Sequence, residues 1–169
     1  LAWPASEASA AFIHRLLAES LKVHHLPRLD FSHGIPPRHQ VLVVIPALLT
    51  SPASSRELVR QLEFHWLANR ERQAQFALLT DWVDATTATV PADAALLRDA
   101  QAQVAALNSR YPADGDMAPR FLLLHRPRSW CETQQRWLGW ERKRGKLEQL
   151  LRTLATGSME GFVPLAAGL

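Results

Sequence analysis

The chain has 169 residues, the size of one ordinary domain, and 47% of them are hydrophobic while 21% are charged. This balance excludes a disordered tail, a collagen-like repeat and a disulfide scaffold, and the single cysteine, Cys131, can form no internal bridge. The apolar stretches are far shorter than the roughly 20 residues of a membrane helix, and no signal peptide opens the chain. We therefore expect a soluble domain.

The formal net charge of +3 is unevenly placed along the chain. Residues 126–146 hold seven Lys or Arg against two acids, a balance of +5, so the rest of the chain sums to −2. A localised basic segment of this kind indicates an anion site rather than general adhesion to nucleic acid or membrane. The seven bases are Arg126, Arg128, Arg136, Arg142, Lys143, Arg144 and Lys146.

The first predicted element is an amphipathic helix over Ala8–Leu21. Phe12, Ile13, Leu16 and Leu17 stand at helical spacing within it. With the linker that follows, this helix forms an N-terminal region of residues 1–30, either packed on the core or belonging to a neighbouring domain.

Strands and helices then alternate over residues 31–157, and residues 158–169 form a short tail. The β-branched run Val41–Ala47 predicts a buried central strand, and Arg56–Asn69, opened by a serine that can cap it, predicts a crossover helix. The remaining elements are a strand over Gln75–Thr80, a helix over Ala92–Tyr111, a strand over Phe121–His125, and a helix over Lys143–Leu154 that Gly157 ends. A polar loop is expected between the third strand, Phe121–His125, and the last helix.

This order predicts an α/β fold, a three-layer Rossmann-like sheet of three adjacent parallel strands. Doubly wound folds are usually built from two halves, so three strands suggest one nucleotide-binding half. Ligands of such sheets bind beyond the carboxyl ends of the strands. There Asp81, expected to be exposed and close to Pro46, can accept hydrogen bonds from a ribose or a base, while Lys146 and the arginines can neutralise phosphates. An alternative of equal weight is that Asp81 and Asp84 only cap the turn after their strand.

Other chemical motifs are weak. Five residues separate Gly139 from Gly145, and Leu147 follows Lys146, so the segment is no phosphate-binding P-loop. The seven histidines lack the spacing and the cysteine partners of a zinc site, and we expect most of them at the surface. Trp130, Trp137 and Trp140 lie among the bases, where stacking on a base of single-stranded nucleic acid or on a sugar competes with core packing, which is favoured for Trp137.

Five collinear blocks between about residues 31 and 154 resemble a known family, the NdvB and ChvB cyclic β-1,2-glucan synthases, in the first part of their glycosyltransferase domain. Ala47, Glu71, Cys131 and Leu151 depart from the residues usual in that family, which are threonine, aspartate, asparagine and asparagine. The five blocks are Val41–Ser51, Phe64–Arg70, Phe76–Asp81 with Asp84 and Ala85, His125–Arg128 with Trp130, and Trp137–Leu147.

The resemblance implies a piece of a large synthase at the cytoplasmic face of the bacterial inner membrane. Its transferase domain has a GT-A type fold and transfers glucose from UDP-glucose, with inversion, to build cyclic β-1,2-glucan. Pro46 and Ala47 would then lie against the uracil, Asp81 would hold the uridine, and Arg144 and Lys146 would lie near the diphosphate. Asp84 completes the expected donor-binding set, and the supporting candidates are Thr50, His125, Arg126, Arg128 and Arg142.

The resemblance places no catalytic residue and no metal ligand in this chain. The Asp-x-Asp motif for Mg²⁺ or Mn²⁺, the catalytic base and the acceptor motif are expected beyond residue 169, so the isolated chain is expected to be inactive. Its expected partners are the nucleotide sugar, the remaining half of the transferase domain and the membrane segments of the synthase, and exposed docking surface would also allow a homodimer. No nucleic-acid partner is expected.

Two alternative functions stay open at this point. One is a non-catalytic α/β module that binds nucleic acid or an acidic partner through Arg126–Lys146. The other is a purely structural interaction domain, which would bind neither UDP-glucose nor an oligonucleotide.

Overall fold

The computed structural model describes residues 2–20, 31–115 and 117–165 and divides the chain into two compact units, Leu1–Ser32 and His33–Leu169. The first unit contains helix α1 (Ala2–Ser20), on which Phe12, Ile13, Leu16 and Leu17 are all at least half exposed. Leu21, the predicted end of this helix, and the predicted linker up to residue 30 lie outside the described residues. Within the described ranges, every helix is too short or too polar to cross a membrane.

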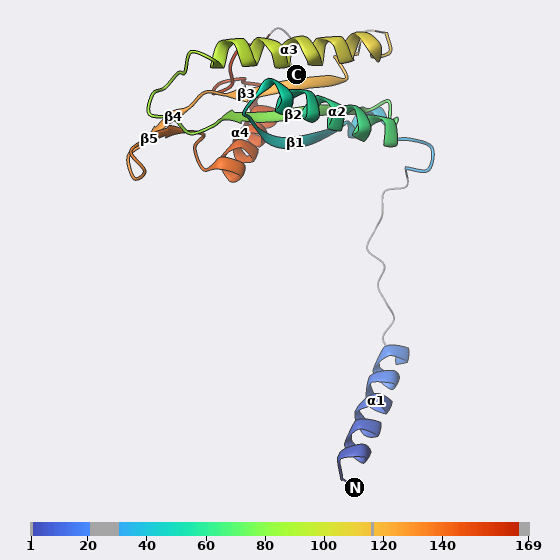
Figure 1. Cartoon of the computed structure of the whole chain (residues 1–169). Helices are drawn as coiled ribbons and strands as arrows, with labels where there is room; N and C mark the ends of the chain where they lie inside the picture. Colours follow the sequence, from blue (N-terminus) through green and yellow to red (C-terminus); the bar gives the residue numbers. More distant parts are fainter. Residues whose placement is uncertain (1, 21–30, 116, 166–169) are drawn as a thin grey trace. The chain divides into compact units, whose positions relative to one another are not determined.

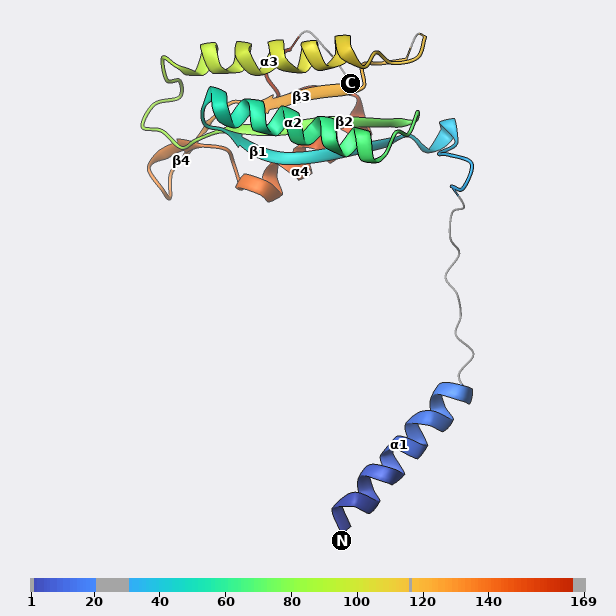
Figure 2. The same ribbon diagram turned by 45° about the vertical axis from the view of Figure 1, so that its right-hand side comes forward.

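The second unit is a parallel sheet with helices on both faces (Figure 1). A short 3-10 helix, η1 (Pro37–His39), precedes the first strand. The strands are β1 (Val41–Leu49), β2 (Ala74–Trp82) and β3 (Phe121–Arg126), in the sheet order β1-β2-β3. Helices α2 (Pro52–Ala68) and α3 (Asp93–Arg110) connect them on one face, and α4 (Arg142–Thr156) lies on the other (Figure 2). The predicted three-layer α/β fold is confirmed.

Alternating side chains of the strands supply two separate cores, because successive residues of a strand point to opposite faces. Phe76 and Leu78 of β2 pack with α2 and α3, whereas Ala77 and Leu79 pack with Leu150 of α4. Each apolar run is therefore buried on both faces, which is why the strands lack the polar alternation of a half-exposed sheet.

The prediction that Val41–Ala47 is a central strand is wrong, because β2 is central and β1 lies at the edge. The residues of β1 are mostly half-buried, while those of β2 are buried almost throughout. An apolar run reports that both faces of a strand are covered, but not how many strands flank it. In the described part of the chain, no strand pairs with the outer edge of β1.

Two further corrections concern the boundaries of elements. Helix α2 begins at Pro52, one turn before the predicted start, because the side chain of Ser51 accepts a hydrogen bond from the Ser54 amide at 3.1 Å and caps it. The expected polar loop after the third strand contains an antiparallel hairpin of β4 (Ser129–Cys131) and β5 (Arg136–Leu138). Trp130 and Trp137 face each other across this hairpin, with ring centroids 5.8 Å apart.

Candidate functional site

A buried ion cluster lies where the three parallel strands end. The register places Leu48 of β1 opposite Asp81 of β2, and Asp81 opposite Arg126 of β3. The Asp81 carboxylate accepts a hydrogen bond from Arg126 Nε at 2.7 Å and one from Arg126 Nη2 at 3.0 Å. Lys146 Nζ of α4 lies 3.0 Å from the same carboxylate. One acid therefore holds two bases, and the cluster keeps one excess positive charge.

The same cluster ties α4 to all three strands. Lys146 Nζ donates to the Ala47 carbonyl of β1 at 2.8 Å, and Arg126 Nη2 donates to the carbonyls of Trp140 at 3.1 Å and Arg142 at 3.3 Å. These carbonyls accept hydrogen bonds from donors that Asp81 leaves over, in keeping with the rule that buried polar groups are hydrogen-bonded. The start of α4 is thus positioned by hydrogen bonds to the carboxyl ends of the strands.

The cluster is almost closed to solvent, since Asp81 is 2% exposed and Arg126 and Lys146 are 3% exposed each. The prediction of an exposed Asp81 is therefore wrong, because two bases distant in the chain and the segment before α4 cover it. The expected closeness to Pro46 agrees with the structure. Pro46 pairs with Leu79, two positions before Asp81, which corresponds to about 8 Å between backbone positions.

Two glycines let the chain close over this cluster. A Cβ at Gly139 would lie 2.7 Å from the carboxylate carbon of Asp81, and a Cβ at Gly145 would lie 2.1 Å from the Trp140 carbonyl oxygen. Between them, Glu141 and Arg142 adopt the left-handed region, with φ of 48° and 42°, a conformation that costs roughly 1–2 kcal/mol per residue. The glycines of this segment serve close packing, in keeping with the rejection of a phosphate loop.

The remaining predicted donor-binding residues lie nearer the surface. Pro46 and Ala47 are half-buried at the end of β1, and Thr50 is exposed. Arg142 donates to Asp84 at 2.7 Å, while exposed Arg144 lies 3.5 Å from Glu141 and does not join the cluster. The fold therefore brings Lys146 to Asp81 and leaves Arg144 outside.

Two of the supporting candidates, Arg128 and His125, are engaged in contacts within the protein. Buried Arg128 forms a two-pronged ion pair with Asp93, donates to the Val83 carbonyl at 2.7 Å and lies over the Trp82 ring. It thereby fastens the loop between β2 and α3, and four of the five N–H donors of its guanidinium already have acceptors within the protein.

His125 is the second of these, and the expectation that most histidines lie at the surface does not hold for it. Its ring is fully buried, with Nδ1 2.8 Å from Thr80 Oγ1 and its edge against Trp82. Burial lowers the pKa of His125 to about 4, so the ring is neutral at pH 7 and cannot neutralise a phosphate.

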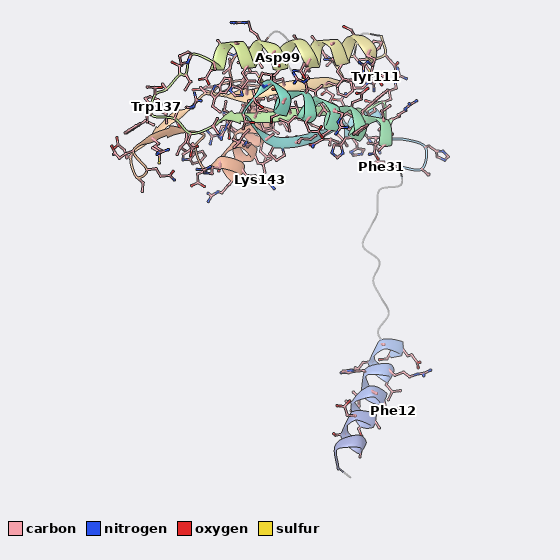
Figure 3. All side chains as sticks on the ribbon, viewed as in Figure 1. Phe12, Phe31, Asp99, Tyr111, Trp137 and Lys143 are labelled. Atoms are coloured by element: carbon pink, nitrogen blue, oxygen red, sulfur yellow. The ribbon has the colours of Figure 1, made fainter. Side chains whose placement is uncertain are left out.

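Sequence reasoning missed the parts of the site that act through the main chain. The carbonyls of Ala47 and Trp140 accept hydrogen bonds from Lys146 and Arg126. Every residue has a main-chain carbonyl, so no sequence motif predicts this role. The hairpin was also missed. It is held at this edge by a bridge to the segment after β2, in which Trp137 and Ala85 exchange two hydrogen bonds of 2.9 Å. Figure 3 labels Trp137 there, at the opposite end of the unit from Tyr111.

The carboxylates at this edge do not fit a divalent metal. Asp81 already faces two cations, and Asp84 is paired with Arg142. Among the residues that the structure describes, no three His, Cys, Asp or Glu side chains gather as metal ligands would.

No protein-family model matches the chain. Among curated proteins, it is similar to the cyclic beta-(1,2)-glucan synthase NdvB of Rhizobium meliloti (strain 1021), with 42% identity over 149 residues. The match covers 88% of this chain and 5% of NdvB, so the chain spans only a small part of that protein's length. The resemblance inferred from the five sequence blocks is confirmed, and the chain is the counterpart of a short segment of the cyclic β-(1,2)-glucan synthase NdvB.

Proposed function

We propose that this chain is the donor-nucleotide-binding half of an inverting glucosyltransferase of the GT-A type. The whole synthase would transfer glucose from UDP-glucose into cyclic β-1,2-glucan at the cytoplasmic face of the inner membrane. The observation that carries the proposal is the basic cluster of Asp81, Arg126 and Lys146 at the carboxyl edge of a parallel sheet, in a chain 42% identical to part of NdvB. This edge is where such sheets bind nucleotides.

The excess positive charge of the cluster favours an anion beside it. A charge held in a low-dielectric environment acts over a longer distance than one in water, and exposed Arg142, Lys143 and Arg144 extend the same field to the surface. In this proposal the diphosphate of the donor binds at the start of α4, and the half-buried Pro46 and Ala47 lie against the uracil.

The burial of Asp81 changes its proposed role from a direct uridine ligand to a positioning residue. Its carboxylate holds Arg126 and Lys146 in place, and those two bases shape the start of α4. Asp84 is the more accessible carboxylate, with 26% of its side chain exposed, and is better placed to accept a hydrogen bond from a ribose hydroxyl.

The proposal assigns the chemical step to other parts of the synthase. Mg²⁺ or Mn²⁺, which would neutralise the leaving diphosphate, and the base that deprotonates the acceptor would come from there. The isolated chain is then expected to bind UDP-glucose weakly and to transfer no glucose.

The unpaired edge of β1 is the proposed docking surface for the remaining half of the transferase domain. β1 is apolar on both faces, and α4 on the sheet face nearby exposes Leu151 and Leu154. An added strand would complete the backbone hydrogen bonds of β1 and cover these leucines. The same surface would serve a homodimer if that half were missing.

The nucleic-acid alternative loses its main support in this structure. Three of the seven bases in the basic segment, Arg126, Arg128 and Lys146, are buried in ion pairs within the chain, so they are not accessible to a phosphate backbone.

Calorimetric titration of the chain with UDP-glucose tests the proposal. We expect a Kd in the sub-millimolar to millimolar range, because half a site makes few contacts. Arg144→Gln should weaken binding severalfold, whereas Arg60→Gln should not, although Arg60 has a similar exposed i,i+3 partner, Glu57. Equal binding by both variants, or stronger binding of a single-stranded oligonucleotide than of UDP-glucose, would contradict the assignment.

A further inference from the structure

A trough runs along α4, beside the proposed donor site. Its volume is about 460 Å³, within the range of roughly 300–1,000 Å³ of small-molecule sites. Trp140 lines it, together with side chains from successive turns of α4 and from the segment after that helix. The polar groups in its wall include Gln149, Arg152, Thr156, Ser158 and Glu160.

Trp140 is a fixed aromatic surface at this trough. Its ring packs against α4 at Gly145, where an added Cβ would lie 2.7 Å from ring atom Cε3. Nevertheless 49% of the residue is exposed to solvent. A large apolar ring that is held by the backbone of a helix but left half open is suited to stacking against a flat apolar ligand surface.

The rest of the lining is polar and charge-balanced. Arg152 and Glu160 contribute one charge of each sign, and the other polar groups are an amide and hydroxyls. Gln149 Nε2 donates to the Glu160 carbonyl at 3.2 Å and lies so close to Gly161 that a Cβ there would be only 2.1 Å away. This amide is thus held in place before any ligand arrives.

We propose that the trough binds the growing β-glucan, a neutral ligand, with one sugar ring stacked on Trp140. A glucan offers apolar ring faces and many hydroxyls but no charge, which matches an aromatic surface beside balanced polar groups. The proposal rests on the proposed function for the choice of glucan. The site is adjacent to the donor edge, because the Trp140 carbonyl accepts a hydrogen bond from Arg126 of the cluster. A sugar ring stacked on Trp140 would therefore lie at the end of the trough that faces the bound donor.

Titration of the 169-residue chain with a linear β-1,2-gluco-oligosaccharide, followed by calorimetry and by saturation-transfer NMR on the sugar protons, tests the site. We expect millimolar binding that Trp140→Ala weakens at least fivefold. Trp130→Ala is the matched control, since Trp130 is similarly exposed, at 41%, but does not line the trough, and it should change binding less than twofold.

A second variant guards against a folding defect in Trp140→Ala. Thr156→Arg places a long side chain at the exposed far end of the trough and should abolish oligosaccharide binding while leaving the circular dichroism spectrum unchanged. The proposal is overturned if wild type does not bind the oligosaccharide, if Trp130→Ala weakens binding as much as Trp140→Ala, or if Thr156→Arg binds like wild type.

A parallel titration with UDP-glucose separates this inference from the proposed function. Loss of oligosaccharide binding in Thr156→Arg with unchanged UDP-glucose binding supports a separate glucan site. A wild-type chain that binds UDP-glucose but no oligosaccharide overturns the trough alone, and one that binds oligosaccharide but no UDP-glucose overturns the donor assignment alone.

Discussion

Two sets of acids and bases at the same edge of the sheet differ sharply in their surroundings. Asp81, Arg126 and Lys146 are buried and joined to four secondary-structure elements. The pair of Asp84 and Arg142 is of similar length, with 63% of the arginine side chain exposed. In the sequence the two sets look equivalent, since both combine an acid at or just beyond the predicted end of the second strand with a base in the segment from Arg126 to Lys146.

The comparison teaches that burial, rather than distance, decides what an ion pair does for this protein. An exposed pair contributes about 0–1 kcal/mol, because water screens it and the side chains lose entropy. Removing one partner of a buried pair costs about 3–5 kcal/mol, because the other charge stays desolvated. The buried set therefore defines the structure of the site, and the exposed set is free to exchange its partner for a ligand.

The largest expected effect comes from breaking the buried set. Asp81→Asn leaves two buried bases without a carboxylate and should lower the free energy of unfolding by about 3–5 kcal/mol, measured by urea denaturation. The matched variant Asp84→Asn should cost less than about 1 kcal/mol. Similar losses in the two variants would remove the distinction between the sets.

The pH dependence of stability sharpens the comparison, because His125 lies beside the buried set. Its pKa is about 4 in the folded chain against 6.5 for the ordinary side chain, so the unfolded chain binds the proton first as the pH falls. The contribution of neutral His125 to the free energy of unfolding is fully present above pH 6.5. As the pH falls from 6.5 to 4, this contribution is lost by about 1.4 kcal/mol per pH unit.

Denaturation curves of wild type, His125→Gln and His65→Gln over this pH window check the expectation. His125→Gln should flatten the dependence, while the variant at exposed His65 should follow wild type. An unchanged slope in His125→Gln would show that other groups cause the acid sensitivity.

A smaller effect is expected from crowding the buried carboxylate. Gly139→Ala would set a methyl group 2.7 Å from the carboxylate carbon of Asp81, which its two bases keep from moving aside. We expect a loss of about 1–3 kcal/mol in the free energy of unfolding. Gly115→Ala is the comparison, since its added methyl would meet nothing within 4 Å and only its φ of +57° opposes it. A smaller loss at Gly139 than at Gly115 would argue against a tightly packed cluster.

The smallest effect concerns the exposed pair itself. A double-mutant cycle with Asp84→Asn and Arg142→Gln should give a coupling energy below about 1 kcal/mol, falling further as salt is added. A coupling above 2 kcal/mol that does not respond to salt would show that this pair belongs to the buried set.

Much of the fold could be predicted because its signals are local. The apolar runs of Gln75–Thr80 and Phe121–His125, and the helical spacing between them, depend only on neighbouring residues. The parallel sheet then follows from the alternation of strands and helices, and the residues at the strand ends follow from the strand boundaries. The sequence therefore determined by itself the α/β class, the resemblance to a cyclic β-(1,2)-glucan synthase, and the nomination of Asp81 and Lys146.

Only the tertiary structure decided how these residues are used. The edge position of β1 depends on which strands exist to flank it, and the hairpin of β4 and β5 depends on pairing and on its bridge to Ala85. The burial of Asp81 depends on Arg126, 45 positions along the chain, and on Lys146 of another helix. The physical reason is that desolvation and pairing are set by whatever surrounds a group in space, and no local pattern of residue types records that environment.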